Sequence, residues 1–123
     1  MRYEISARRL DATGSLATAH GAEVRLATGM QGRKDALTPV ELPLSALAAC
    51  MIKGTKRVTP KLNFQPDGRT VKLEADRQDS PPKLTAIRDQ ITVATSEPDA
   101  RVDLLHRNIL KYGTISNRLT AAI

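Results

Sequence analysis

TPVELPLSALAAC, residues 38–50, is the stretch of sequence that decides the fold. Thr38 can act as the N-cap of a helix, Pro39 suits the first helical position, and Glu41 follows three residues after the cap. At that spacing the hydroxyl and the carboxylate can each accept a hydrogen bond from the other residue's backbone, which completes a capping box. The stretch therefore predicts the start of a helix.

The predicted helix runs to about Val58 and is stopped by Pro60. Pro43 has no backbone donor, so we expect either a local distortion there or a regular helix that begins close to it. The helix centre, residues 44–52, is apolar on nearly all sides, which is typical of a helix enclosed by protein. Its end carries cations that favour the negative end of the helix dipole: Lys53, Lys56 and Arg57.

Segments with alternating apolar residues flank this helix and indicate β-strands. The five predicted strands are residues 2–10, 15–19, 22–28, 69–77 and 84–95. A turn at His20–Gly21 joins the second strand to the third, and the polar segment 78–82 joins the last two. Because the strands are grouped apart from the helices, we predict an α+β fold with a mostly antiparallel sheet.

A second helix is predicted where Ser96-Glu97-Pro98-Asp99 reads as another capping box. Gly113 is expected to end it as a C-cap, and residues 114–122 form one more short element, capped by Ser116 and Asn117. The predicted buried stripe of the second helix is Val102, Leu105, Ile109 and Tyr112. Residues 1–123 are therefore expected to form a single domain.

The composition limits the kinds of site that the chain can carry. Only three aromatic residues occur among 123, so an aliphatic core is expected, with further burial in an oligomer interface. The single cysteine, Cys50, excludes an internal disulfide. With only His20 and His106 besides, no metal-ligand cluster is visible, and no cofactor is expected.

The formal charge of +6 raises the alternative of nucleic-acid binding. The basic residues are scattered and aromatic stacking platforms are scarce, so a solvated basic surface that draws anionic ligands is favoured instead. The N-terminal residues do not resemble a signal peptide, and the longest apolar run is too short to cross a bilayer. We therefore expect a soluble, cytoplasmic protein that binds no membrane.

Two segments resemble the osmotically inducible protein C (OsmC) and organic hydroperoxide resistance (Ohr) family. Residues 38–50 are similar to its pattern N-P-E-E-L-L-x-A-A-x-A-A-C, and YGTISN, residues 112–117, is similar to C-P-x-S-N. The order of strands and helices agrees as well. The resemblance implies an OsmC-like fold in an intertwined homodimer, with a site at each subunit interface. Relatives continue through a final strand, which leaves open whether this chain is truncated at its C-terminus.

The family resemblance also implies a chemistry, the reduction of organic hydroperoxides by thiols. In the family a cysteine on the long helix attacks the peroxide, and a second cysteine resolves the resulting sulfenic acid. A glutamate and an arginine set the protonation of the first cysteine and orient the substrate. Cys50 matches the attacking cysteine, whereas Gly113 stands in the place of the resolving one. Val40 occupies the glutamate position, and Glu41 lies one residue later, about 100° around the helix.

The family arginine has no secure match, and Arg9 and Arg33 are its candidates. The residues leave two hypotheses open. In the first, Cys50 is the nucleophile of a thiol-dependent peroxidase that needs an external thiol reductant, because Gly113 cannot resolve a sulfenic acid. In the second, Cys50 is a structural residue in a non-catalytic dimer that binds a small apolar or anionic ligand.

Overall fold

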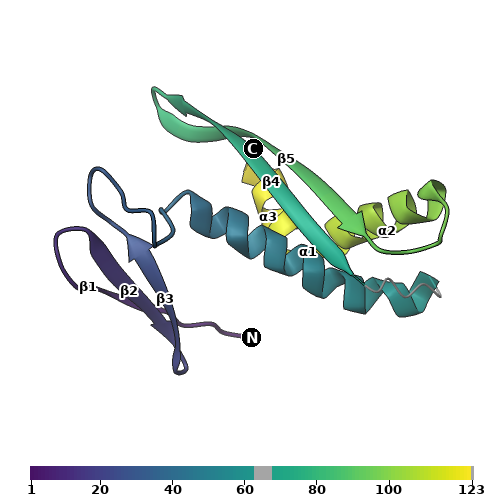
Figure 1. Ribbon diagram of the computed structural model, residues 1–123, viewed down its shortest axis with the longest axis horizontal. Helices are drawn as coiled ribbons and strands as arrows, with labels where there is room; N and C mark the ends of the chain where they lie inside the picture. Colours follow the sequence, from purple (N-terminus) through teal and green to yellow (C-terminus); the bar gives the residue numbers. More distant parts are fainter. Residues whose placement is uncertain (63–67, 123) are drawn as a thin grey trace. The chain divides into compact units, whose positions relative to one another are not determined.

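The computed structural model describes residues 1–62 and 68–122; for residues 61, 62, 121 and 122 it describes the backbone alone. The chain divides into two compact units, Met1–Leu44 and Ser45–Ile123, called unit 1 and unit 2 below. Figure 1 labels the elements along the chain. Each unit is considered by itself.

Unit 1 is a three-stranded antiparallel sheet with the strand order β1-β2-β3. Its strands are β1 (Ser6–Arg9), β2 (Gly14–Ala19) and β3 (Ala22–Ala27). His20 and Gly21 both have positive φ angles, 41° and 91°, as a two-residue hairpin turn requires. The predicted turn is thus confirmed. The first strand is shorter than predicted, because its pairing ends at Ser6 with Thr18, close to the end of β2.

The start of α1 (Glu41–Leu62) confirms the predicted capping box. The backbone N–H of Thr38 donates to Glu41 Oε1 over 2.8 Å, and the N–H of Glu41 donates to Thr38 Oγ1 over 3.3 Å. Pro43 cannot donate to the carbonyl of residue 39, so regular helix begins at Glu41, close to Pro43. Of the two alternatives expected at Pro43, the structure therefore shows the helix that begins close to it.

The predicted end of this helix was wrong, because Pro60 lies inside α1 and the helix continues to Leu62. A proline in the last turns removes a single hydrogen bond of the helix. Val58 and Thr59, which come directly before it, are both 3% exposed, so packing holds this part of the helix in place.

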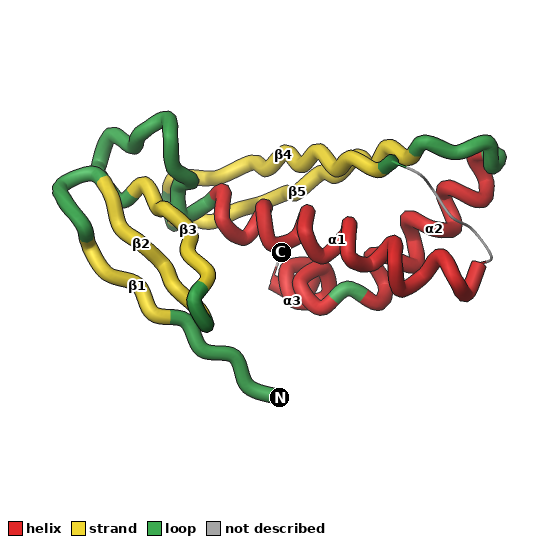
Figure 2. The backbone as a smooth tube through the Cα atoms, turned by 60° about the horizontal axis from the view of Figure 1, so that its bottom comes forward, coloured by secondary structure: helices red, strands yellow, loops and turns green. Residues whose placement is uncertain are grey.

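Unit 2 is built on a long antiparallel hairpin of β4 (Arg69–Asp79) and β5 (Pro82–Val93). This confirms the predicted pair, with ends shifted by a few residues. The apolar face of the hairpin packs against the helices, and Figure 2 shows the helices of unit 2 on one side of it. The packed side chains are Val71, Leu73, Ile87, Ile91 and Val93. The alternating pattern therefore identified the buried face correctly.

Two helices complete unit 2, α2 (Asp99–Tyr112) and α3 (Thr114–Ala122). The predicted capping box of α2 was wrong: its N-cap is Pro98, and no side chain caps it, because the regular helix starts after the proline. Tyr112 was expected to be buried but is 47% exposed, whereas Leu105 and Ile109 are buried. Gly113 occupies the predicted C-cap position, with φ −83°.

Asn117 does not cap α3 as predicted, since its side-chain amide donates instead to the carbonyl of Lys111, at the end of α2, over 3.1 Å. Ser116 is buried in the first turn of α3. The two residues therefore join α2 to α3 and border the cavity described below.

The core of unit 2 consists of Leu47, Met51 and Val58 from α1 with Leu105 and Ile109 from α2. The helix centre was expected to be enclosed by protein within a dimer, and that enclosure stays a prediction. Only one face of α1 packs on the core, so the opposite face has no cover. The exposed residues between 45 and 56 are Ser45, Ala46, Ala49, Ile52, Lys53 and Lys56. The α+β class with antiparallel sheets is confirmed.

Candidate functional site

Cys50 lies on α1 and its side chain faces the junction of α2 and α3. It is a free, half-buried cysteine. A Cβ atom built on Gly113 would lie 3.5 Å from Cys50 Sγ and 3.3 Å from the Cβ of Ser116. Among the described residues, no charged group or hydrogen-bond donor is paired with the sulfur. The structure thus brings together Cys50 and the position at which the family's second cysteine was expected.

The other predicted site residues belong to unit 1. Glu41 and Arg33 line the same open cavity of about 610 Å³, together with Arg25, Lys34 and Asp35. Arg9 does not line it and is exposed on β1. The structure therefore brings together one acidic and one basic candidate, Glu41 and Arg33, and leaves Arg9 apart.

Hydrogen bonds fix both of these groups. The capping contact with the Thr38 backbone holds the pKa of Glu41 below its ordinary value. Arg33 pairs with Asp35 through two hydrogen bonds, Nε to Oδ1 at 2.5 Å and Nη2 to Oδ2 at 2.8 Å. These bonds lower the pKa of Asp35 and raise that of Arg33. Arg33 is therefore an oriented guanidinium whose charge is balanced by Asp35.

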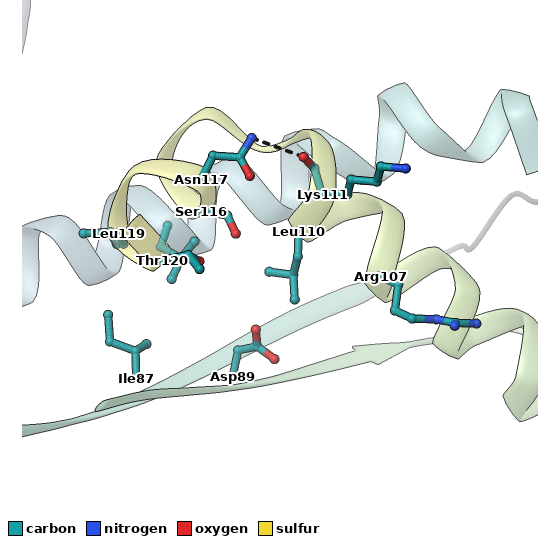
Figure 3. Close-up of a pocket in the computed structure, with 10 residues that line it drawn as sticks. Ile87, Asp89, Arg107, Leu110, Lys111, Ser116, Asn117, Leu119 and Thr120 are labelled. Atoms are coloured by element: carbon teal, nitrogen blue, oxygen red, sulfur yellow. Dashed lines mark hydrogen bonds between the residues drawn. The ribbon is translucent and has the colours of Figure 1, made fainter. Parts of the chain in front are cut away.

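Unit 2 contains a second cavity, of about 720 Å³, between β5 and the α2–α3 corner. Figure 3 shows the side chains around it, and Leu47 of α1 completes its lining. Two of its polar side chains, those of Asp89 and Ser116, point toward the middle of the cavity (Figure 3). Cys50 is not among the lining residues.

Asp89 pairs with His106 behind this cavity wall. His106 Nε2 lies 2.8 Å from Asp89 Oδ1, close enough for an ion pair when the imidazole is protonated. The contact lacks the angles of a well-aligned hydrogen bond. Sequence reasoning treated His106 as an ordinary helix residue and passed over Asp89. The signal was present, because Asp89 occupies an inward position of β5 between Ile87 and Ile91.

Two kinds of site receive no support from the described residues. No group of three or more His, Cys, Asp or Glu side chains there is arranged to hold a metal ion. None of the helices in this part of the chain is both long and apolar enough to span a bilayer.

A family model described as OsmC-like protein matches residues 32–123. The chain belongs to the OsmC-like family. The resemblance noted at residues 38–50 and 112–117 is thereby confirmed. The matched region contains Arg33, Glu41 and Cys50 but not Arg9. No curated protein matches the sequence.

Solved structures share the OsmC-like fold. An OsmC-like protein from Mycoplasma pneumoniae has a TM-score of 0.88 at 16% identity, covering 98% of this chain and 88% of that one. An organic hydroperoxide resistance protein OsmC from Legionella pneumophila, also described as a predicted redox protein, has a TM-score of 0.74 at 17% identity, covering 95% and 89%. The organic hydroperoxide resistance protein OhrB of Bacillus subtilis has a TM-score of 0.68 at 14% identity, covering 96% and 90%. At these identities the likeness shows the fold.

Proposed function

We propose that this OsmC-like protein reduces organic hydroperoxides through Cys50 as its only redox-active thiol, with an external thiol as the reductant. The observation that carries the proposal is the closeness of Cys50 to position 113. A Cβ atom built on Gly113 would lie 3.5 Å from Cys50 Sγ. This is the pair of positions at which the family holds its attacking and resolving cysteines. Two of the structural neighbours are named for hydroperoxide resistance, which supports the same chemistry.

The reaction would proceed in three balanced steps. The Cys50 thiolate attacks the outer oxygen of the hydroperoxide, the O–O bond breaks, and the alcohol leaves after taking up a proton. Cys50 is then a sulfenic acid. Because the chain has no second cysteine, an external thiol attacks this sulfur and releases water, giving a mixed disulfide. A second external thiol reduces that disulfide and restores Cys50. Such thiols are abundant in the cytoplasm, where we expect the protein to act.

A cation must lie near the sulfur for the thiolate to form readily. Arg33 remains the stronger candidate for this cation and Glu41 the candidate for the family's glutamate, since both lie within the family match and line one cavity of unit 1. Arg9 is the weaker candidate, since it lies outside this cavity and outside the family match.

The proposal includes a homodimer. The uncovered face of α1 carries small and apolar residues, such as Ala49 and Ile52, beside Lys53 and Lys56. Unit 1 buries Ala27 as its only apolar side chain among the described residues, too small a core for a unit of this size. Tyr3 and Ile5 are 84% and 72% exposed. A second copy of the chain would cover these surfaces.

Peroxide consumption tests the proposal directly. Reduced protein is mixed with tert-butyl hydroperoxide and dithiothreitol, and the rate is compared with that of the Cys50→Ser variant at equal concentration. We expect turnover in the native protein and only the background rate in the variant. If free thiol counting shows Cys50 intact after prolonged exposure to the hydroperoxide without reductant, the proposal is wrong.

A second candidate function is non-catalytic binding of a small apolar or anionic ligand by a dimer of the same fold. It is favoured by the absence of a charged partner for the Cys50 sulfur among the described residues of one protomer. In cells, a Cys50→Ser change that abolished protection against hydroperoxides would exclude this candidate.

A further inference from the structure

The cavity in unit 2 has walls suited to an aliphatic molecule. Leu47, Ile87, Leu110 and Leu119 contribute apolar side chains to it. Its volume of about 720 Å³ falls within the roughly 300–1,000 Å³ that is usual for small-molecule sites. All four side chains also pack against the core cluster or belong to it, so the walls are held in place by the fold.

Two polar groups are directed toward the interior of this cavity (Figure 3). Ser116 is 7% exposed, and its hydroxyl has no hydrogen-bond partner among the described residues. The Asp89 side chain is 17% exposed. One of its oxygens lies beside His106, and within the described part of the chain the other accepts no hydrogen bond. Both groups are therefore open to a ligand that enters the cavity.

The carboxylate that lines this cavity belongs to Asp89. Arg107 and Lys111 also line it, but Figure 3 shows their charged ends directed away from Asp89. The cations of the neighbouring strands are already paired, Arg88 with Asp76 and Lys72 with Glu74. In this view the charged group directed toward the interior is the carboxylate of Asp89, which also pairs with His106.

We propose that this cavity is a binding site for an aliphatic amine, with the ammonium group on Asp89 and Ser116 and the hydrocarbon chain between Leu47, Ile87, Leu110 and Leu119. A primary ammonium group has three N–H donors, which serve both the free carboxylate oxygen and the hydroxyl. This site is separate from the proposed hydroperoxide chemistry, because Cys50 does not line it.

Three probes with the same hydrocarbon chain and different head groups test the site: octylamine, octanol and octanoate. Each is titrated calorimetrically into the 123-residue protein. We expect octylamine to bind at least about tenfold more tightly than the other two, equivalent to about 1.4 kcal/mol. Non-specific attraction to a protein with a net charge of +6 would favour octanoate, so it cannot produce this order. Tightest binding of octanoate, or no binding of octylamine, would overturn the proposal.

Matched variants locate the bound head group. Asp89→Asn should weaken octylamine binding by at least about tenfold, whereas Asp103→Asn, the same change at an exposed site on α2 that does not line the cavity, should leave it unchanged. Ser116→Ala should weaken it by a smaller factor. Cys50→Ser should bind octylamine as the native protein does, which separates this site from the peroxidase proposal. Equal octylamine binding by Asp89→Asn and the native protein would contradict the assignment. If Asp89→Asn fails to fold, the order of affinities of the native protein for octylamine, octanol and octanoate still tests the proposal.

Discussion

Replacing Gly113 by cysteine should create an internal disulfide with Cys50. A Cβ at position 113 would lie 3.5 Å from Cys50 Sγ, so the new sulfur could bond to Cys50 after a small adjustment. The backbone φ of −83° at Gly113 is open to any residue, so the substitution meets no conformational barrier. The bond would close a loop of roughly 60 residues, worth about 4 kcal/mol in the chain-entropy estimate.

One contact opposes this gain. The new Cβ would lie 3.0 Å from the carbonyl oxygen of Ile109, and this backbone atom can give way only a little. Overpacking of this kind typically costs about 1–3 kcal/mol. We therefore expect the reduced Gly113→Cys variant to be less stable than the native protein and the oxidised variant to be more stable than its reduced form.

The assay is urea unfolding of Gly113→Cys with and without dithiothreitol, together with a count of free thiols. Gly113→Ser is the matched control, since it adds a side chain of similar size that cannot form a disulfide. The reasoning is refuted if mild oxidation leaves both thiols of Gly113→Cys titratable, or if the bond forms only between chains. Either result would mean that Cys50 does not face position 113.

Three further predictions follow from packing, capping and charge. Met51→Ala should lower the free energy of unfolding in urea by about 2–5 kcal/mol, because Met51 is 1% exposed. The neighbouring Ile52 is 38% exposed, so Ile52→Ala should lower it by under about 1 kcal/mol. Ile52→Ala should nevertheless shift sedimentation toward the monomer. Thr38→Ala should cost about 1 kcal/mol and reduce helical circular dichroism, since Thr38 caps α1. The pKa of Asp76 is lowered by its hydrogen bond from Arg88. The stability lost in Asp76→Asn should therefore be constant above the ordinary pKa of 3.8 and vanish as the pH falls further, measured by urea unfolding at each pH.

Features that depend on neighbouring residues in the sequence could be predicted. The capping box of Thr38 and Glu41, the turn at His20–Gly21 and the long hairpin all followed from local spacing, and the structure confirms them. The boundaries were less certain, because a proline's effect depends on what packs around it. Pro60 was expected to end α1, yet buried Val58 and Thr59 keep the helix intact beyond it.

Features that depend on distant segments could not be predicted. Within the helix centre the exposed face of α1 also carries apolar residues, Ala46, Ala49 and Ile52, so the pattern of apolar residues there did not identify the side that packs on the core. Cys50 lies close to position 113 because α1 packs against the α2–α3 junction. The pair of Asp89 and His106 likewise joins a strand to a helix, and only the polar residue on an apolar strand face hinted at it.

The central claim, that Cys50 is oxidised by hydroperoxide and reset by an external thiol, is tested most directly by intact-mass spectrometry of the native protein. After one equivalent of cumene hydroperoxide, the account predicts a mass increase of a single oxygen atom on Cys50, which subsequent glutathione converts to a mixed disulfide. An unchanged mass after the hydroperoxide, with the thiol still reactive toward alkylation, would contradict it.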